Sequence, residues 1–111
     1  MDFNAYQFRA KSTAQYPDRN GPVGLYYTAL GLVSEAGEVA GKVKKIIRDD
    51  NGQISDEKKK QILDEVGDVL WYCAMIADEL NTNFGYVAEI NANKLEDRKQ
   101  RGVIKGSGDN R

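Results

Sequence analysis

The sequence contains no histidine, and this absence excludes several kinds of active site. Imidazole-based zinc sites, Ser-His-Asp and Cys-His arrangements, and HD-type phosphohydrolases all require that side chain. The helical di-iron sites built on Glu-x-x-His are disfavoured for the same reason. A metal ion would therefore have to be held by carboxylates, which favours Mg²⁺ or Mn²⁺.

The sequence also has only one cysteine, no long apolar run and almost no net charge. The single cysteine, Cys73, cannot form an internal disulfide, and we expect it to act as a small buried hydrophobe. No apolar run reaches the ~20 residues that span a bilayer, and the first residues lack the features of a signal peptide. With 16 basic and 17 acidic residues, no strong field attracts nucleic acid or a membrane. We therefore expect a cytoplasmic protein with neither kind of partner.

The 111 residues fit a single domain, 1–111, whose core is small enough that oligomerisation would help its stability. Apolar residues recur with the helical period in two long segments, at about 25–48 and 56–80. Shorter helices are predicted at about 3–15 and 84–101. No strand-like alternation persists, so the sequence predicts an all-α fold of four helices, two of them long and central. The glycine-rich tail 102–111 is predicted to be mobile without a ligand.

Two acidic pairs border the apolar stripes of the long helices. Glu35 and Glu38 are three residues apart, as are Glu65 and Asp68, and such residues share a helical face. If the helices pack through their stripes, all four carboxylates converge on one rim. Their mutual repulsion would be relieved by a divalent cation, which suits phosphate chemistry. The alternative is a solvated acidic face with intrahelical pairs such as Glu38 with Lys42.

Small and aromatic residues accompany the acids. Gly37 and Gly67 each lie between the two acids of a pair, where glycine costs ~1 kcal/mol relative to alanine. We expect them to allow close helix approach, although simple tolerance of glycine is the alternative. Tyr72 shares the face of Glu65 and would either stack on a base or pack. Trp71 points elsewhere and is predicted to lie in the core or at a subunit interface.

The last predicted helix has a polar face suited to a polyphosphate, because its amide and cationic groups recur every three or four residues. An ordinary exposed basic face is the alternative. The residues of this face are Asn91, Lys94, Arg98 and Arg101.

Three stretches resemble the MazG-like nucleotide pyrophosphohydrolases of the all-α NTP pyrophosphatase superfamily. They are "GLVSEAGEVAGKVKK", "DEVGDVLWYCAMIADEL" and "NANKLEDRKQRGVIKGSGDNR". The resemblance covers roughly residues 3–111. One departure is Ser34, where many relatives carry a further acid. This difference affects the number of carboxylates at the metal site rather than the existence of the site.

The resemblance implies a Mg²⁺-dependent hydrolase, with Mn²⁺ as an alternative, that converts nucleoside triphosphates to monophosphates and pyrophosphate in nucleotide-pool house-cleaning. Glu35, Glu38, Glu65 and Asp68 would bind the metal. Glu35 and Glu38 would be catalytic, with Glu38 the candidate base that activates water.

The resemblance also implies roles for residues outside the acidic pairs. Lys94 and Arg98 would hold phosphates, Asn91 would contact the nucleotide, and Tyr72 and Gln7 would line the base pocket. The family assembles as dimers or dimers of dimers, so a homodimer or homotetramer is expected. The alternatives are a pyrophosphatase of the same superfamily that prefers dUTP or dCTP, a more distant phosphoribosyl-ATP pyrophosphohydrolase, and a weakly active helical regulatory or binding module.

Overall fold

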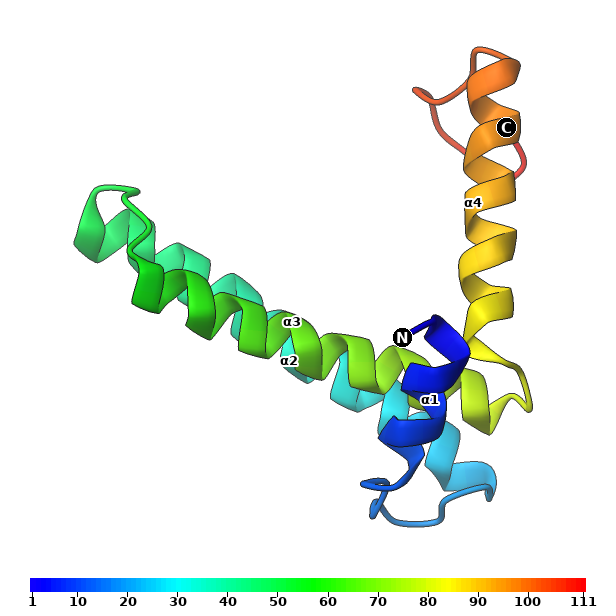
Figure 1. The fold of residues 1–111 in the computed structure, drawn as a ribbon. Helices are drawn as coiled ribbons and strands as arrows, with labels where there is room; N and C mark the ends of the chain where they lie inside the picture. The colour runs from blue at the N-terminus through cyan, green and yellow to red at the C-terminus, as the bar shows by residue number, and fades with distance from the viewer.

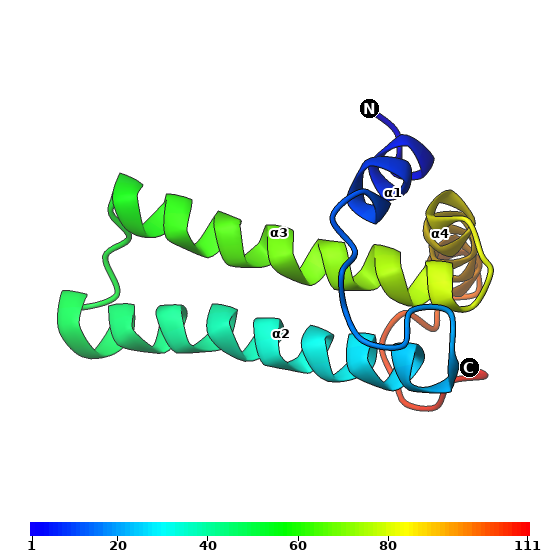
Figure 2. The same ribbon diagram turned by 90° about the horizontal axis from the view of Figure 1, so that it is seen from below.

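The computed structural model describes residues 1–111 as four α-helices without a strand. They are α1 (Phe3–Lys11), α2 (Pro22–Asp50), α3 (Asp56–Glu79) and α4 (Phe84–Gln100). Helices α2 and α3 form a long antiparallel hairpin, α1 lies across one end of it, and α4 projects steeply away from that end (Figures 1 and 2). The prediction of an all-α fold with two long central helices is confirmed. None of the helices has both the length and the apolar character needed to cross a bilayer.

The tight connection between α2 and α3 depends on two left-handed residues. Asn51 and Gly52 have φ of 52° and 75°, and the N–H groups of both donate to the carbonyl of Ile46 at the end of α2. Asparagine and glycine tolerate this conformation better than other residues do. Ser55 then caps α3 by accepting a hydrogen bond from the N–H of Lys58 at 3.1 Å. The turn therefore folds the two long helices back against each other.

Helix α1 ends at Lys11, four residues earlier than predicted. The hydroxyl of Ser12 donates to the carbonyl of Arg9 at 2.6 Å, and that of Thr13 donates to the carbonyl of Ala10 at 2.9 Å. Side-chain bonds of this kind compete with the helical ladder. The predicted end at about residue 15 did not take this local competition into account.

Helix α2 begins at Pro22, three residues before the predicted start. Proline suits the first helical position because its missing N–H has no helical partner there. The carboxylate of Asp18 accepts a hydrogen bond from the N–H of Val23 at 2.7 Å and so caps the first turn. The predicted start of this helix at about residue 25 was therefore wrong.

Gln7 joins α1 to both α3 and α4. Its side-chain amide donates to the carbonyls of Ala74 at 3.3 Å and Thr82 at 3.0 Å, and its oxygen accepts from the N–H of Phe84 at 3.0 Å. Asn4 accepts from the next N–H of α4 in the same way, at 2.8 Å. Because the first N–H groups of a helix lack helical partners, α1 supplies the cap that α4 does not make for itself.

The core of the single chain is small. Only 11 of 111 residues are buried, among which Met75 and Thr28 are the largest that are fully enclosed. The extents of 43 × 43 × 27 Å reflect two arms rather than a closed bundle. Large apolar side chains on α2 stay exposed, including Leu30 at 72%, Val33 at 70% and Ile47 at 69%. This agrees with the expectation of a small core.

At Gly31, α2 packs directly against the side chain of Tyr72 from α3. A Cβ atom there would overlap the ring of Tyr72, so the absence of a side chain lets the ring lie against the backbone of α2. Gly37 and Gly67 instead face open space, with no atom within 4 Å of an added Cβ. The prediction that these two glycines allow close approach is therefore wrong within the chain.

We expect Gly31→Ala to lower the free energy of unfolding by about 1–3 kcal/mol, because the methyl group must displace the Tyr72 ring. Gly37→Ala is the matched control and should leave stability unchanged or raise it by up to ~1 kcal/mol, since alanine favours helix. Urea unfolding followed by circular dichroism measures both. A Gly31→Ala protein as stable as the parent would contradict the close packing of the Tyr72 ring against Gly31.

Candidate functional site

Three of the four predicted acids converge. Glu35 on α2 and Glu65 and Asp68 on α3 each offer a carboxylate oxygen, and these oxygens lie within 4.8 Å of one another. The contact between Gly31 and Tyr72 explains why. Glu35 follows Gly31 by four residues on α2, and Asp68 precedes Tyr72 by four residues on α3. Because the two helices are antiparallel, Glu35 and Asp68 both lie about one turn from the Gly31–Tyr72 contact, on the same side of it.

Glu38 does not join this group. On α2 the buried residues Thr28 and Ile46 lie five helical turns apart and define the line that faces the protein interior. At about 100° per residue, Glu35 lies about 20° from that line and Glu38 about 80° from it. Glu38 is accordingly exposed. The expected convergence of four carboxylates is therefore corrected to three, with Glu38 beside them.

Negative charge at the three-acid group is only partly compensated. Burial, followed by the charges of Asp68 and Glu65, raises the pKa of Glu35 above its ordinary value, and Glu38 adds a smaller effect. One cation pairs with the group: the ammonium of Lys42 lies 3.5 Å from a carboxylate oxygen of Glu65. The group thus has an excess of anionic oxygen atoms that attracts a cation.

The donor set fits a hard divalent cation. All three candidate ligands are carboxylates on two long helices, and the group contains neither histidine nor cysteine. Mg²⁺ and Mn²⁺ prefer oxygen ligands of this kind, and Mg²⁺ usually takes only some of its ligands from the protein. Glu35, Glu65 and Asp68 are therefore the residues that would hold such an ion.

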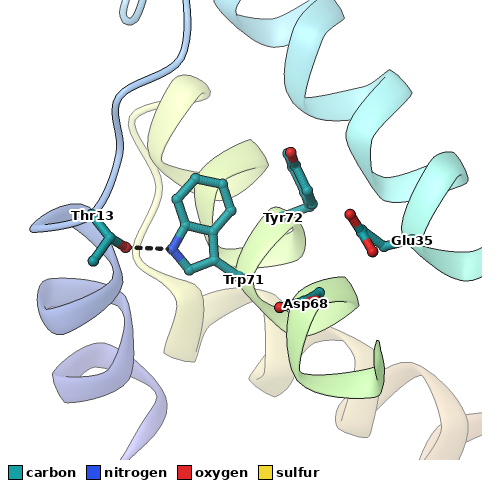
Figure 3. Close-up of a pocket in the computed structure, with 5 residues that line it drawn as sticks. All are labelled: Thr13, Glu35, Asp68, Trp71 and Tyr72. Carbon is teal, nitrogen blue, oxygen red and sulfur yellow. Dashed lines mark hydrogen bonds between the residues drawn. The ribbon is translucent and has the colours of Figure 1, made fainter. Parts of the chain in front are cut away.

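An open pocket of about 370 Å³ adjoins the acids (Figure 3). It is lined by Thr13, Glu35, Asp68, Trp71 and Tyr72. The carboxylates come from the two helices of the hairpin, while the indole of Trp71 extends toward Thr13. The pocket therefore presents anionic oxygens and aromatic rings to one small volume.

Both aromatic side chains of the pocket are held in place. The indole N–H of Trp71 donates to the hydroxyl of Thr13 at 2.9 Å and to the carbonyl of Ala10 at 3.2 Å. The rings of Trp71 and Tyr72 meet edge to face, with centroids 5.0 Å apart and an interplanar angle of 85°. Burial is the main cause that raises the pKa of Tyr72, so its phenol stays protonated at neutral pH.

Trp71 and Thr13 were not predicted as site residues. The half-buried Trp71 packs against the core, where the sequence analysis allowed it, but it also lines the pocket. Its spacing of three residues from Asp68 was a usable signal, because residues so spaced share a helical face. Thr13 lies in a turn, and nothing in its sequence context pointed to the site.

Helix α4 does not bring its polar residues to the acids within one chain. No close backbone contact joins α4 to α2, and α4 extends away from the hairpin (Figure 1). Asn91 and Lys94 line a separate shallow groove with Val87 and Ile90. Arg98 is only 8% exposed, and its guanidinium donates to the carbonyl of Asp109 at 2.8 Å.

The tail after α4 folds back on the end of that helix. The guanidinium of Arg111 donates to the carbonyls of Gly108 at 2.8 Å, Val103 at 3.2 Å and Ile104 at 3.2 Å. Arg101 is the last cation of the predicted polar face. Its guanidinium donates to the carbonyl of Arg111 and forms an ion pair with the carboxylate of Asp97 at 2.8 Å. Mobility of this tail in solution stays a prediction.

Gln7, predicted to line the base pocket, lies instead among α1, α3 and α4. It is 6% exposed, and its side-chain nitrogen and oxygen are already bonded within the protein. Its amide is therefore not free to contact a nucleotide, and the structure gives it a structural role.

The chain belongs to the MazG family: residues 26–103 match the family described as the MazG nucleotide pyrophosphohydrolase domain. This confirms the family resemblance, and the matched segment contains both acidic pairs. The chain is also similar to the "Gene 37 protein" of Mycobacterium phage L5, with 49% identity over 114 residues that cover the whole of both proteins. The comparison with solved structures found no match.

We expect Glu35→Gln to raise the melting temperature of the metal-free protein by about 2–4 °C at pH 7, because it removes one of three repelling charges. The pKa of Glu35 is raised in the folded state, so the folded chain binds this proton more readily than the unfolded chain. The advantage of the variant should therefore be full above the raised pKa and disappear as the pH falls to the ordinary value of 4.5. Calorimetry in EDTA across this range measures it. A melting temperature equal to that of the parent at pH 7 would contradict the charge excess.

Proposed function

We propose that this protein is a Mg²⁺-dependent nucleoside triphosphate pyrophosphohydrolase, with Mn²⁺ as an alternative metal, that acts in nucleotide-pool house-cleaning. Family membership supports a nucleotide pyrophosphohydrolase. The observation that carries the proposal is the convergence of Glu35, Glu65 and Asp68, with uncompensated charge, beside an aromatic pocket. A bound Mg²⁺ would supply positive charge to phosphate oxygens and lower the pKa of a coordinated water.

The acids divide into two roles. Glu35, Glu65 and Asp68 would hold the metal, while Glu38 stands outside their group but close enough to affect Glu35. A carboxylate left free of the metal is able to accept a proton. Glu38 takes the proton of the attacking water, and the water oxygen forms a bond to the α- or the β-phosphorus. The anhydride bond between these two phosphoryl groups breaks at the same time. The products are a nucleoside monophosphate and pyrophosphate.

The pocket next to the acids would accept the nucleoside part of the substrate. Trp71 and Tyr72 offer aromatic surface there, and stacking on such rings is worth about 1–3 kcal/mol per base. Because stacking tolerates every base, these rings would bind a nucleobase without distinguishing one base from another. The cytoplasmic location stays a prediction that suits a nucleotide substrate.

The phosphate-binding roles of Asn91, Lys94 and Arg98 require a second chain, because α4 projects away from the acids of its own chain. We propose a homodimer or homotetramer in which α4 of one copy serves the acids of another. The exposed apolar face of α2, with Leu30 and Val33, supports this because monomeric proteins rarely expose large contiguous apolar patches. Arg98 would have to exchange its bond to the tail for a phosphate.

A pyrophosphate-release screen over ribo- and deoxynucleoside triphosphates, with Mg²⁺ and with EDTA, tests the activity. Glu38→Gln should lower kcat by about 100-fold or more while Mn²⁺ binding persists, because it removes the base and leaves the metal group intact. Asp64→Asn is the control, since Asp64 is exposed and lies outside the group. Absence of metal-dependent product from every nucleotide would refute the enzyme, and unchanged turnover in Glu38→Gln would refute its role. A preference for dUTP or dCTP would appear in the same screen.

Leu30→Glu should shift the protein toward the 12.4 kDa monomer, because a charge cannot be buried cheaply in an apolar interface. Ile104→Glu changes an exposed apolar side chain of the tail in the same way and is the control. Sedimentation velocity at several concentrations measures the mass. A parent protein that sediments as a monomer at all concentrations would refute the proposed assembly.

A further inference from the structure

Lys42 occupies an unusual place at the edge of the three-acid group. It follows Glu35 by seven residues, which is two turns along α2 and about 20° around it. Its ammonium reaches across to α3 and lies 3.5 Å from an oxygen of Glu65, with side-chain exposures of 33% and 19%. The other ion pairs of the protein lie elsewhere, on Asp49, Asp78 and Asp97. Lys42 is thus the cation of this site in the structure.

We propose that Lys42 is a built-in counter-ion of the metal site: it holds Glu65 in the metal-free protein and gives up that carboxylate when a divalent cation binds. This inference rests on the metal site of the proposed function and goes beyond it, because it assigns a role to a residue that is not a ligand. Lys42 is in these terms a positioning residue.

Charge makes Lys42 and a divalent cation compete for Glu65. Three carboxylates with oxygens within 4.8 Å repel one another, and the ammonium of Lys42 offsets one of the three charges. The carboxylate of Glu65 that pairs with the ammonium is also a candidate ligand of an incoming cation, and two positive groups at one carboxylate repel. We therefore expect metal binding to release Lys42 from Glu65, at a cost in affinity for the metal.

Loss of the Lys42 ammonium would change both metal-free stability and metal affinity. Without the ammonium, the metal-free acids repel more strongly and the folded protein is less stable. A divalent cation then has no competitor and binds more tightly. Because partly exposed ion pairs are worth up to about 1 kcal/mol, the gain in affinity should be about two- to fivefold and should shrink at high salt.

Three variants test the proposal, with Mn²⁺ alone as the probe and no nucleotide present. Lys42→Met removes the charge and Lys42→Arg retains it. Lys44→Met removes the same charge from the same helix, but Lys44 is exposed, lies about 160° away around the helix, and has no ion pair. Titration calorimetry at low salt measures Mn²⁺ affinity, and melting in EDTA measures metal-free stability.

We expect Lys42→Met to bind Mn²⁺ about two- to fivefold more tightly than Lys44→Met and to melt a few degrees lower in EDTA, whereas Lys42→Arg resembles the parent. Equal affinity and equal melting of the two methionine variants would overturn the proposal, as would weaker Mn²⁺ binding by Lys42→Met. If no variant and no parent protein bound Mn²⁺, the metal site of the proposed function would fail. The melting difference would then still decide whether Lys42 offsets the charge of the acids.

Discussion

The Tyr72 ring of α3 lies against the bare backbone of α2 at Gly31, and the acidic site depends on the register in which the two helices pack there. One helical turn from this contact, Glu35 and Asp68 face each other from opposite helices. A side chain at residue 31 would have to displace that ring. The packing of the Tyr72 ring and the spacing of the carboxylates therefore depend on the same arrangement of α2 and α3.

The same register creates an electrostatic conflict that suits a metal site. Three carboxylates are held together by packing elsewhere in the hairpin, and the pKa of Glu35 rises because of burial and of its neighbours. Strain of this kind persists only when the surroundings are well determined, and it is typical of functional sites. Lys42 relieves part of the conflict from within the chain, and a divalent cation would relieve the remainder.

Helix α1 connects α3 to the start of α4, a role that its composition does not indicate. Gln7 and Asn4 accept hydrogen bonds from the first N–H groups of α4, and Gln7 also ties α1 to α3. These bonds fix where α4 starts and help to set the direction in which it leaves the hairpin. As a consequence α4, which carries Lys94 and Arg98, makes no close backbone contact with α2, and this motivates the proposed sharing of sites between subunits.

The sequence by itself determined the helices and the candidate acids, because helical periodicity, caps and i, i+3 spacing are local properties of the chain. It also indicated an oxygen-only metal site, since the chain has no histidine. Only the tertiary structure decided that Glu38 stands apart from the other three acids, that Gly31 rather than Gly37 makes the close contact, and that Gln7 is structural. These outcomes depend on the rotation and register of one helix against another, which are set by long-range packing and cannot be read from the period of either helix alone.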